Sequence, residues 1–175
     1  GYHSGNLAIG NRAGITFLAL GNSSGDIGFV GHVIGGVEPG AGNLISGNQN
    51  GINILAGTGH SIQGNFIGTN ADGTGALGNS FAGIGLNYGD FGGGSGDVLI
   101  GGADTAARNI ISASNIGVLV RSSPFNDIQV RIQGNYIGTD VTGTLGFANL
   151  YGIQLQGNGH IVGGAAPGEG NLISA

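Results

Sequence analysis

The 175-residue chain has no cysteine, methionine or tryptophan, and only 7% of its residues are charged. Without cysteine, the chain can form no disulfide, thiolate metal site or cysteine nucleophile. Its net charge is −5, and its basic residues are four scattered arginines, Arg12, Arg108, Arg121 and Arg131. A nucleic-acid partner is therefore not expected, because such partners need a continuous basic face.

Long apolar runs are also lacking, so no insertion into a membrane is expected. The length is that of a single domain over residues 1–175. Richness in glycine, asparagine, serine and threonine without any lysine favours an extracellular or cell-surface location over the cytosol.

Glycine, in contrast, is abundant, at 42 of 175 residues. This is more than three times ordinary usage. The glycines follow no strict collagen-like period, and a hydrophobic content of 39% argues against disorder. They recur at fixed places between short apolar phrases, which is typical of turns.

Those apolar phrases repeat along the chain. Gly-Asn-Leu-Ile-Ser at 42–46 returns at 170–174, and a close copy, Arg-Asn-Ile-Ile-Ser, lies at 108–112. Gln-Gly-Asn-Phe-Ile-Gly-Thr at 63–69 returns with tyrosine in place of phenylalanine at 133–139. Self-similarity of this kind indicates a solenoid.

Three phrases recur in constant order, each with apolar residues at alternate positions, the period of a half-buried strand. We call them the first phrase (Val-Ile-Gly-Gly at 33–36), the second phrase (Asn-Leu-Ile at 43–45) and the third phrase (Ile-Asn-Ile at 52–54), each with its later copies. Three strands per turn predict an all-β, right-handed, three-sided parallel β-helix of about five coils. The first phrases should stack through Ile34, Ile62, Ile100, Ile132 and Val162. The second phrase is followed by serine in one coil, as at Ser46, and by Gly-Thr and an insert in the next coil, as at Thr69. The sequence repeat is therefore two coils long.

Two further columns follow from stacking the second phrase. Its asparagine should form an inward, structural ladder of side-chain amides, made of Asn43, Asn65, Asn109, Asn135 and Asn171. The next residue should point outward and form an apolar stripe, which either lies under the inserts or provides a lateral contact with another chain or a glycan. The stripe is Leu44, Phe66, Ile110, Tyr136 and Leu172.

The phrases at 42–54, 62–86 and 98–102 resemble the right-handed parallel β-helix repeats of large bacterial and archaeal surface proteins. The resemblance covers about residues 5–175. It implies the fold and says little about activity, because the wider class includes polysaccharide lyases, epimerases, adhesins and inert stalks.

Catalytic chemistry finds little support. Nearly all acids lie beside glycine or asparagine in turns, and the outward middle positions of the third phrase carry neither acids nor bases: Thr16, Asn53, Gly85, Leu119 and Gln154. We therefore expect no catalytic residue and no cofactor. A regular threonine array for ice binding is disfavoured, because Thr69 and Thr139 recur only in alternate coils.

Metal binding has two candidates, neither of which we favour. His32 and His60 should be neighbours one coil apart, with His160 at the same place in a later coil, but valine holds that place in the intervening coils. Segments 70–74 and 140–144 resemble calcium loops with too few carboxylates. We expect packed histidines, ordinary turns and no metal.

No phrase of different sequence closes either end as a cap. We therefore expect a non-catalytic structural module of an extracellular filament or cell-surface stalk. It would join head to tail with copies of itself or with further repeats of a longer chain. The alternative is a carbohydrate-binding or adhesive module. A polysaccharide lyase- or epimerase-like enzyme is less favoured.

Overall fold

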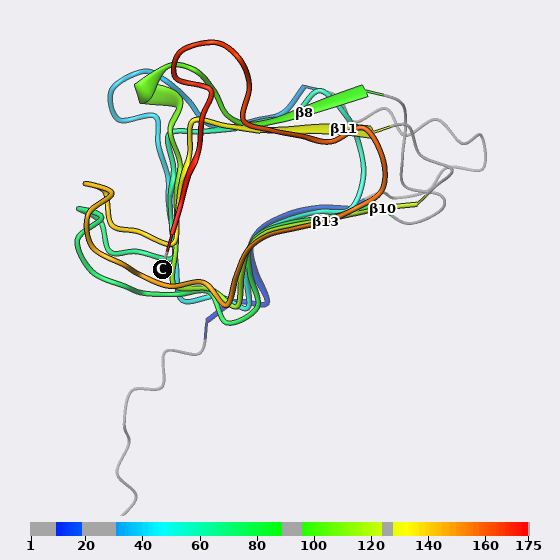
Figure 1. Cartoon of the computed structure of the whole chain (residues 1–175). Coiled ribbons are helices and arrows are strands. Elements are labelled where there is room, and N and C mark those ends of the chain that lie inside the picture. Colours follow the sequence, from blue (N-terminus) through cyan, green and yellow to red (C-terminus); the bar gives the residue numbers. More distant parts are fainter. Residues whose placement is uncertain (1–9, 19–30, 89–95, 124–127, 175) are drawn as a thin grey trace, which may run out of the picture.

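In a computed structural model, which describes residues 10–18, 31–88, 96–123 and 128–174, the chain is an all-β parallel solenoid (Figure 1). The described residues form three parallel sheets of five strands each. The first sheet holds β2 (Val33–Gly35), β5 (Ser61–Gln63), β8 (Gly96–Gly101), β11 (Ile128–Gln133) and β14 (Ile161–Val162). The second holds β3 (Leu44–Ile45), β6 (Phe66–Ile67), β9 (Ile110–Ile111), β12 (Tyr136–Ile137) and β15 (Leu172–Ile173). The third holds β1 (Ala13–Phe17), β4 (Asn50–Ile54), β7 (Ala82–Tyr88), β10 (Ile116–Ser122) and β13 (Tyr151–Gln156).

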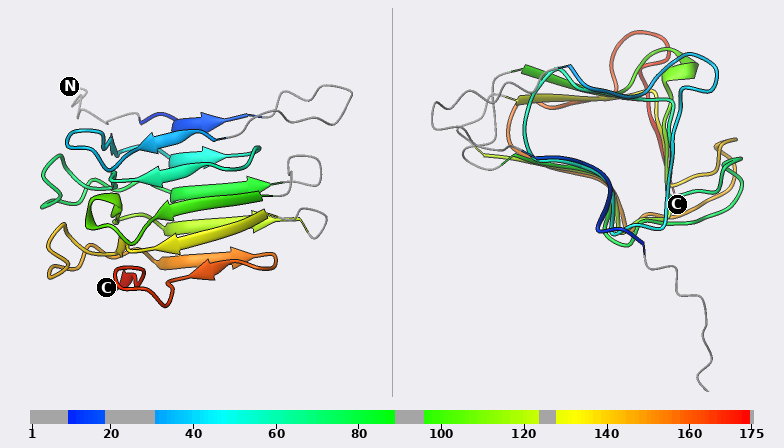
Figure 2. Two further views of the ribbon diagram at one scale, coloured as in Figure 1. Left: turned by 90° about the horizontal axis from the view of Figure 1, so that it is seen from above. Right: turned by 180° about the vertical axis from the view of Figure 1, so that it is seen from behind.

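The coils stack along one axis, as the two further views show (Figure 2). Each coil passes through the first, second and third sheet in turn, and the coiling is right-handed (Figures 1 and 2). The one helical element among the described residues is a short 3-10 turn, η1 (Thr105–Ala107), after β8. The predicted fold is therefore confirmed. No helix among the described residues is long and apolar enough to cross a membrane.

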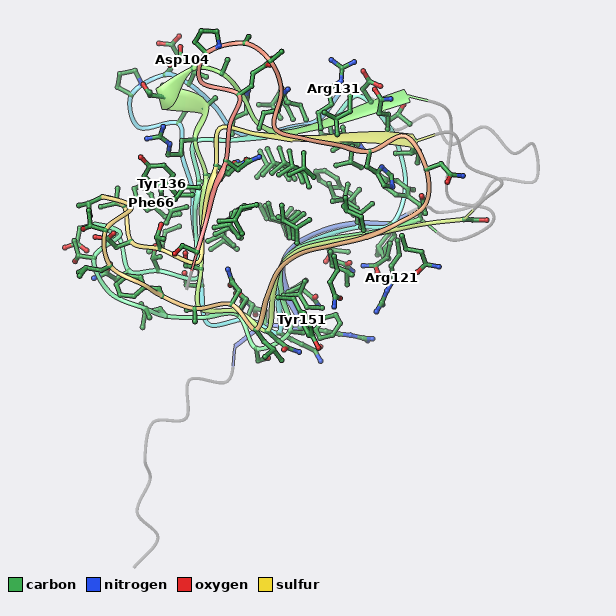
Figure 3. All side chains as sticks on the ribbon, in the orientation of Figure 1. Phe66, Asp104, Arg121, Arg131, Tyr136 and Tyr151 are labelled. Atoms are coloured by element: carbon green, nitrogen blue, oxygen red, sulfur yellow. The ribbon has the colours of Figure 1, made fainter. Side chains whose placement is uncertain are left out.

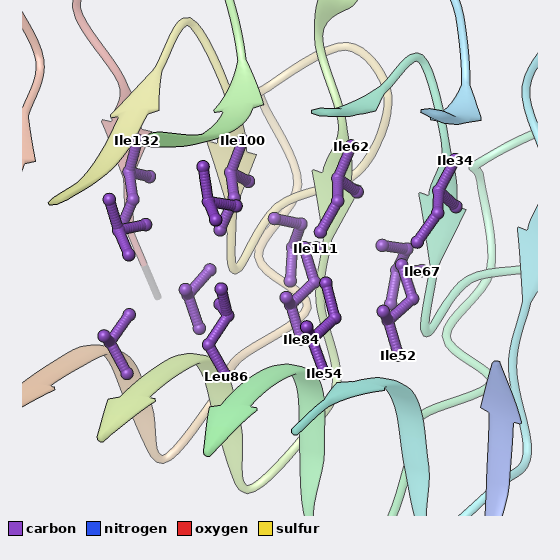
Figure 4. Packing of buried hydrophobic residues seen from close by; sticks show 14 of the residues in the cluster. Ile34, Ile52, Ile54, Ile62, Ile67, Ile84, Leu86, Ile100, Ile111 and Ile132 are labelled. Carbon is purple, nitrogen blue, oxygen red and sulfur yellow. The ribbon is translucent and has the colours of Figure 1, made fainter. Parts of the chain in front are cut away.

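Stacked isoleucines form the core, which runs the length of the coils (Figure 4). The register pairs Ile34 with Ile62, Ile62 with Ile100 and Ile100 with Ile132, so the predicted first-sheet column is confirmed. The second sheet adds its own column, made of Ile45, Ile67, Ile111 and Ile137. Each fully buried side chain of this size stabilises the fold by about 1.5–3 kcal/mol.

The two-coil repeat has a steric cause. The inserts begin at Thr69 and Thr139, each closed by an antiparallel bridge, to Ala76 and Gly146. The backbone N–H of Val141 in the later insert donates to the carbonyl of Gly73 in the earlier one, at 3.0 Å. The two inserts thus contact each other directly, because the coil between them carries no insert of its own. An insert fills the height of two coils, so only every second coil can carry one.

The intervening coil carries serine where the insert coils carry threonine. The hydroxyl of Ser46 donates to the carbonyl of Thr69 at 2.7 Å, and that of Ser112 donates to the carbonyl of Thr139 at 2.7 Å. Each serine therefore supports the start of the insert in the following coil.

The third sheet bends sharply at a column of glycines, Gly14, Gly51, Gly83, Gly117 and Gly152. Within β10, Ile116 and Leu119 belong to one small apolar cluster outside the main core, although they are three residues apart. Strict alternation would place them on opposite faces, so the strand must bend between them. At Gly117, an added Cβ would lie 2.5 Å from the carbonyl oxygen of Gly152 and 3.0 Å from the side chain of Ile137. Only glycine fits there.

Replacing one glycine of this column should be costly. In Gly83→Ala, the new Cβ would stand 2.8 Å from both the Gly117 oxygen and Ile111 Cγ2. Overpacking of this kind destabilises by about 1–3 kcal/mol. We expect a loss of that size in the free energy of unfolding, measured by urea titration.

The matched control lies two residues along the same strand. Gly85→Ala places its Cβ on the outer face, 3.1 Å from the movable Asn87 amide. It should change stability by less than about 1 kcal/mol. Equal losses in the two variants would contradict the assigned role of the glycine column.

Candidate assembly interface

The five asparagines of the second phrase hydrogen-bond to one another in a single ladder. The backbone N–H and the Nδ2 group of each donate to Oδ1 of the next, over distances of 2.9–3.2 Å. Nδ2 of Asn109 also donates to the carbonyl of Ile62 at 2.8 Å. Asn65, Asn109 and Asn135 are at most 1% exposed, so these bonds replace water inside the protein.

The bonds between the asparagines have a direction, because each asparagine donates to Oδ1 of the asparagine in the next coil toward the C-terminus. Asn171, its last member, donates through Nδ2 to the carbonyl of Ile132 at 2.7 Å. Its backbone N–H has no acceptor among the described residues. At the other end, no described group donates to Oδ1 of Asn43. Among the described residues, the ladder therefore ends in a free donor on one side and in a free acceptor on the other.

A second ladder runs beside the first, and sequence reasoning missed it. Asn11 donates to Oδ1 of Asn48 at 3.3 Å, and the backbone N–H of Asn48 donates to Oδ1 of Asn79 at 3.1 Å. Farther along, the backbone N–H of Ser114 donates to Oδ1 of Asn149 at 2.9 Å. The overlooked signal is a Gly-Asn or Ala-Asn pair just before four of the third-sheet strands.

Apolar side chains of the last coil are exposed at the C-terminal edge. Leu155, Val162 and Ile173 are 42%, 45% and 48% exposed. Their in-register neighbours in the preceding coil, Val120, Ile132 and Ile137, are fully buried. The exposed residues continue inward-facing columns, so they are core residues that no described strand covers. We call this surface the open edge.

The predicted stripe lies in register but is largely covered. Leu44 is 50% exposed, Ile110 is 3% exposed, and Phe66, Tyr136 and Leu172 are half-buried. Figure 3 shows Phe66 and Tyr136 beside the inserts. A Cβ at Gly73 would lie 2.7 Å from the Phe66 ring, and one at Gly143 would lie 2.9 Å from the Tyr136 ring. The inserts thus cover the middle of the stripe, and a lateral contact through it stays a prediction.

Tyr136 is covered from a second side as well. The guanidinium of Arg108 lies 4.0 Å from the centre of its ring, and Nε of Arg108 donates to the carbonyl of Gly134 at 3.1 Å. This cation–π contact leaves less of the ring for another molecule.

In the histidine column, the rings of His60 and His160 are hydrogen-bonded to the backbone. The rings of His32 and His60 stack with centroids 5.2 Å apart, and Phe17 packs against both. Nδ1 of His60 accepts from the backbone N–H of His32 at 3.2 Å, and Nε2 lies 3.2 Å from the carbonyl of Ala56. The Nε2–H tautomer satisfies both bonds, so neither ring nitrogen is free for a metal. His160 makes the same two contacts, with Val130 and Gln156.

The two loops with calcium-like spacing use their carboxylates to hold their own turns. Oδ1 of Asp72 accepts from the hydroxyl of Thr74 at 2.6 Å, and this bond is the main cause of the lowered pKa of Asp72. Desolvation raises the pKa of Asp140, but bonds from the Leu145 N–H and the Thr142 hydroxyl outweigh it and leave that pKa lowered. The described residues contain no group of three or more His, Asp or Glu side chains placed to hold a metal ion.

A scan of protein-family models, a search of curated proteins and a search of solved structures each found no match. The parallel solenoid is therefore established by the structure of the chain itself. None of these comparisons identifies the particular surface-protein family that the repeats resemble.

Breaking the buried ladder should destabilise the fold strongly. Asn109→Leu keeps the side-chain volume but removes the Oδ1 atom that accepts from Asn65, which leaves the buried backbone N–H of Asn65 without an acceptor, and it also removes the Nδ2 donor to Oδ1 of Asn135. Each unsatisfied group costs about 1–3 kcal/mol. We expect the free energy of unfolding, measured by urea titration, to fall by about 3 kcal/mol. Asn43→Leu, at the exposed end of the ladder, serves as the control and should cost less than half as much.

His60 should make stability depend on pH. Burial is the main cause that lowers the pKa of His60 below 6.5, with a further contribution from His32. The unfolded chain therefore binds a proton more readily than the folded one, so stability is lost as pH falls below about 6.5. We expect a lower melting temperature at pH 5 than at pH 7.5, and a smaller difference in His60→Gln. His160→Gln should keep the difference, and its loss there would contradict this assignment.

Proposed function

We propose that the chain is a non-catalytic structural module that joins end to end with another coil of the same kind, extending a β-solenoid filament or stalk. The observation that carries the proposal is the open edge, where Leu155, Val162 and Ile173 expose side chains belonging to buried columns. Covering such side chains is the main favourable term in association.

The hydrogen-bonding groups of this edge select the partner. A parallel strand placed against β14 or β15 would pair with backbone groups as β11 and β12 do from the other side. The N–H of Asn171 needs an oxygen at the position that a ladder asparagine would occupy. An edge such as that of β2 and β3 supplies it, because Oδ1 of Asn43 accepts no bond from the described residues.

The direction of the ladder also limits how two copies of the chain can be oriented when they join. Donors at one edge and an acceptor at the other favour head-to-tail stacking over a two-fold dimer. A head-to-tail contact between unlike surfaces does not close on itself, so it builds a filament. The added coil comes from another copy of the chain or from further repeats of a longer protein. The repeat resemblance and the composition support a place on the cell surface or outside the cell.

Charges placed on the open edge should abolish this assembly. The test variant is Val162→Asp with Ile173→Asp, examined by sedimentation velocity and negative-stain electron microscopy over a range of concentrations. We expect the unmodified chain to form rods that lengthen with concentration, and the variant to remain monomeric, because carboxylates buried at an interface are costly.

The control adds the same charges away from the edge. Leu77 and Leu145 are 53% and 57% exposed at the two inserts, away from the edge strands, so Leu77→Asp with Leu145→Asp should assemble like the unmodified chain. An unmodified chain that stays monomeric at high concentration, with its circular dichroism intact, would contradict self-assembly.

A further inference from the structure

The outer face of the bent third sheet is hollowed, and it takes no part in the proposed end-to-end assembly. A hollow of about 720 Å³ extends over β1, β4 and β7, and a second of about 410 Å³ continues over β10 and β13. The bend at the glycine column makes this face concave. Figure 3 shows Tyr151 and Arg121 projecting from its two arms. We call this surface the outer groove.

Polar side chains with spare hydrogen-bonding capacity line the groove. Nδ2 of Asn87 donates to Oδ1 of Asn53 at 2.9 Å, across the gap left by Gly85. This leaves Nδ2 of Asn53 and Oδ1 of Asn87 without partners among the described residues. The side chains of Gln49 and Asn50 make no hydrogen bond there either. The ladder asparagines, in contrast, use their amides for structure.

The charge of the groove is opposite to that of the whole chain. Of the four arginines, Arg131 pairs with Asp97 and Arg108 covers Tyr136. Arg12 and Arg121 project from the third sheet with no acidic partner among the described residues. Among the described residues, no acid lines either hollow. The net charge of the chain is −5, so two guanidinium groups on one face without a described acidic partner favour an anionic ligand there.

The spacing suits an extended ligand. Arg12 lies just before β1 and Arg121 lies near the end of β10, three strands farther along the sheet and six positions farther along the strands. Three strand spacings are about 14 Å and six strand residues span up to about 20 Å, so a ligand that contacts both arginines must be extended and run obliquely across the sheet. Between the two arginines lie the amides and the ring of Phe81, an aromatic surface of the kind on which sugar faces pack.

We propose that the outer groove binds a linear acidic polysaccharide. Its carboxylate or sulfate groups pair with Arg12 and Arg121, and its hydroxyls bond to Asn53 and Asn87. The groove holds the ligand without cleaving it, because the described part of its lining has no carboxylate or histidine to act as an acid or base. The groove lies on the side of the solenoid and shares Leu155 with the open edge, but the arginines and asparagines that hold the ligand lie outside that edge.

The test is calorimetric titration of the chain with three oligosaccharides of matched length: an oligouronate, a heparin oligosaccharide and a neutral cello-oligosaccharide. We expect at least one acidic ligand to bind and the neutral one not to bind. Preference for the oligouronate or the heparin oligosaccharide identifies carboxylate or sulfate as the recognised group. Arg12→Gln and Arg121→Gln should each weaken binding about tenfold, the effect of losing one charge-assisted hydrogen bond.

The matched control is Arg131→Gln, which removes the same charge from the outer face of the first sheet. It should leave the affinity within about twofold of that of the unmodified chain. An equal loss in Arg131→Gln would show non-specific attraction and overturn the proposal. Equal binding of the neutral ligand, or no binding by any of the three, would overturn it as well.

Discussion

Each residue of this solenoid must lie directly against its counterpart in the next coil, about 4.8 Å away. A side chain is therefore acceptable only if a similar one can stack on it. Isoleucine stacks on isoleucine to fill the core, asparagine bonds to asparagine at the bend, and glycine lies on glycine where the third sheet turns. The parallel sheets and the core both result from this single constraint.

The same constraint explains where the chain departs from strict repetition. An insert is too thick for one coil spacing, so it occurs in every second coil and contacts the next insert directly through Val141 and Gly73. Serine fills the place between them and bonds to the carbonyl of the following threonine. The alternation in sequence is thus a packing requirement. It also places Gly73 and Gly143 against the aromatic residues of the stripe, which limits how much of that stripe another molecule could reach.

The side-chain columns that stack between coils of one chain can stack in the same way against a coil of another chain. This links the architecture to the proposed assembly, because the open edge presents the same columns that bury each other farther inside. The outer groove obeys different rules, since its side chains face solvent and need no matching neighbour. Thr16, Asn53, Gly85, Leu119 and Gln154 all differ although they share one column. Variation of this kind lets a repetitive scaffold carry a specific surface.

The sequence by itself determined the solenoid, its three strands per coil and the first-sheet column, because stacking turns each spatial column into a visible repeat. Only the tertiary structure decided how far the inserts cover Phe66 and Tyr136, and that both ring nitrogens of His60 are bonded. It also decided that a glycine column bends the third sheet into a groove, and that a second amide ladder passes through Asn48 and Asn79. These features depend on side-chain direction and on contacts between loops, which a repeated phrase does not specify.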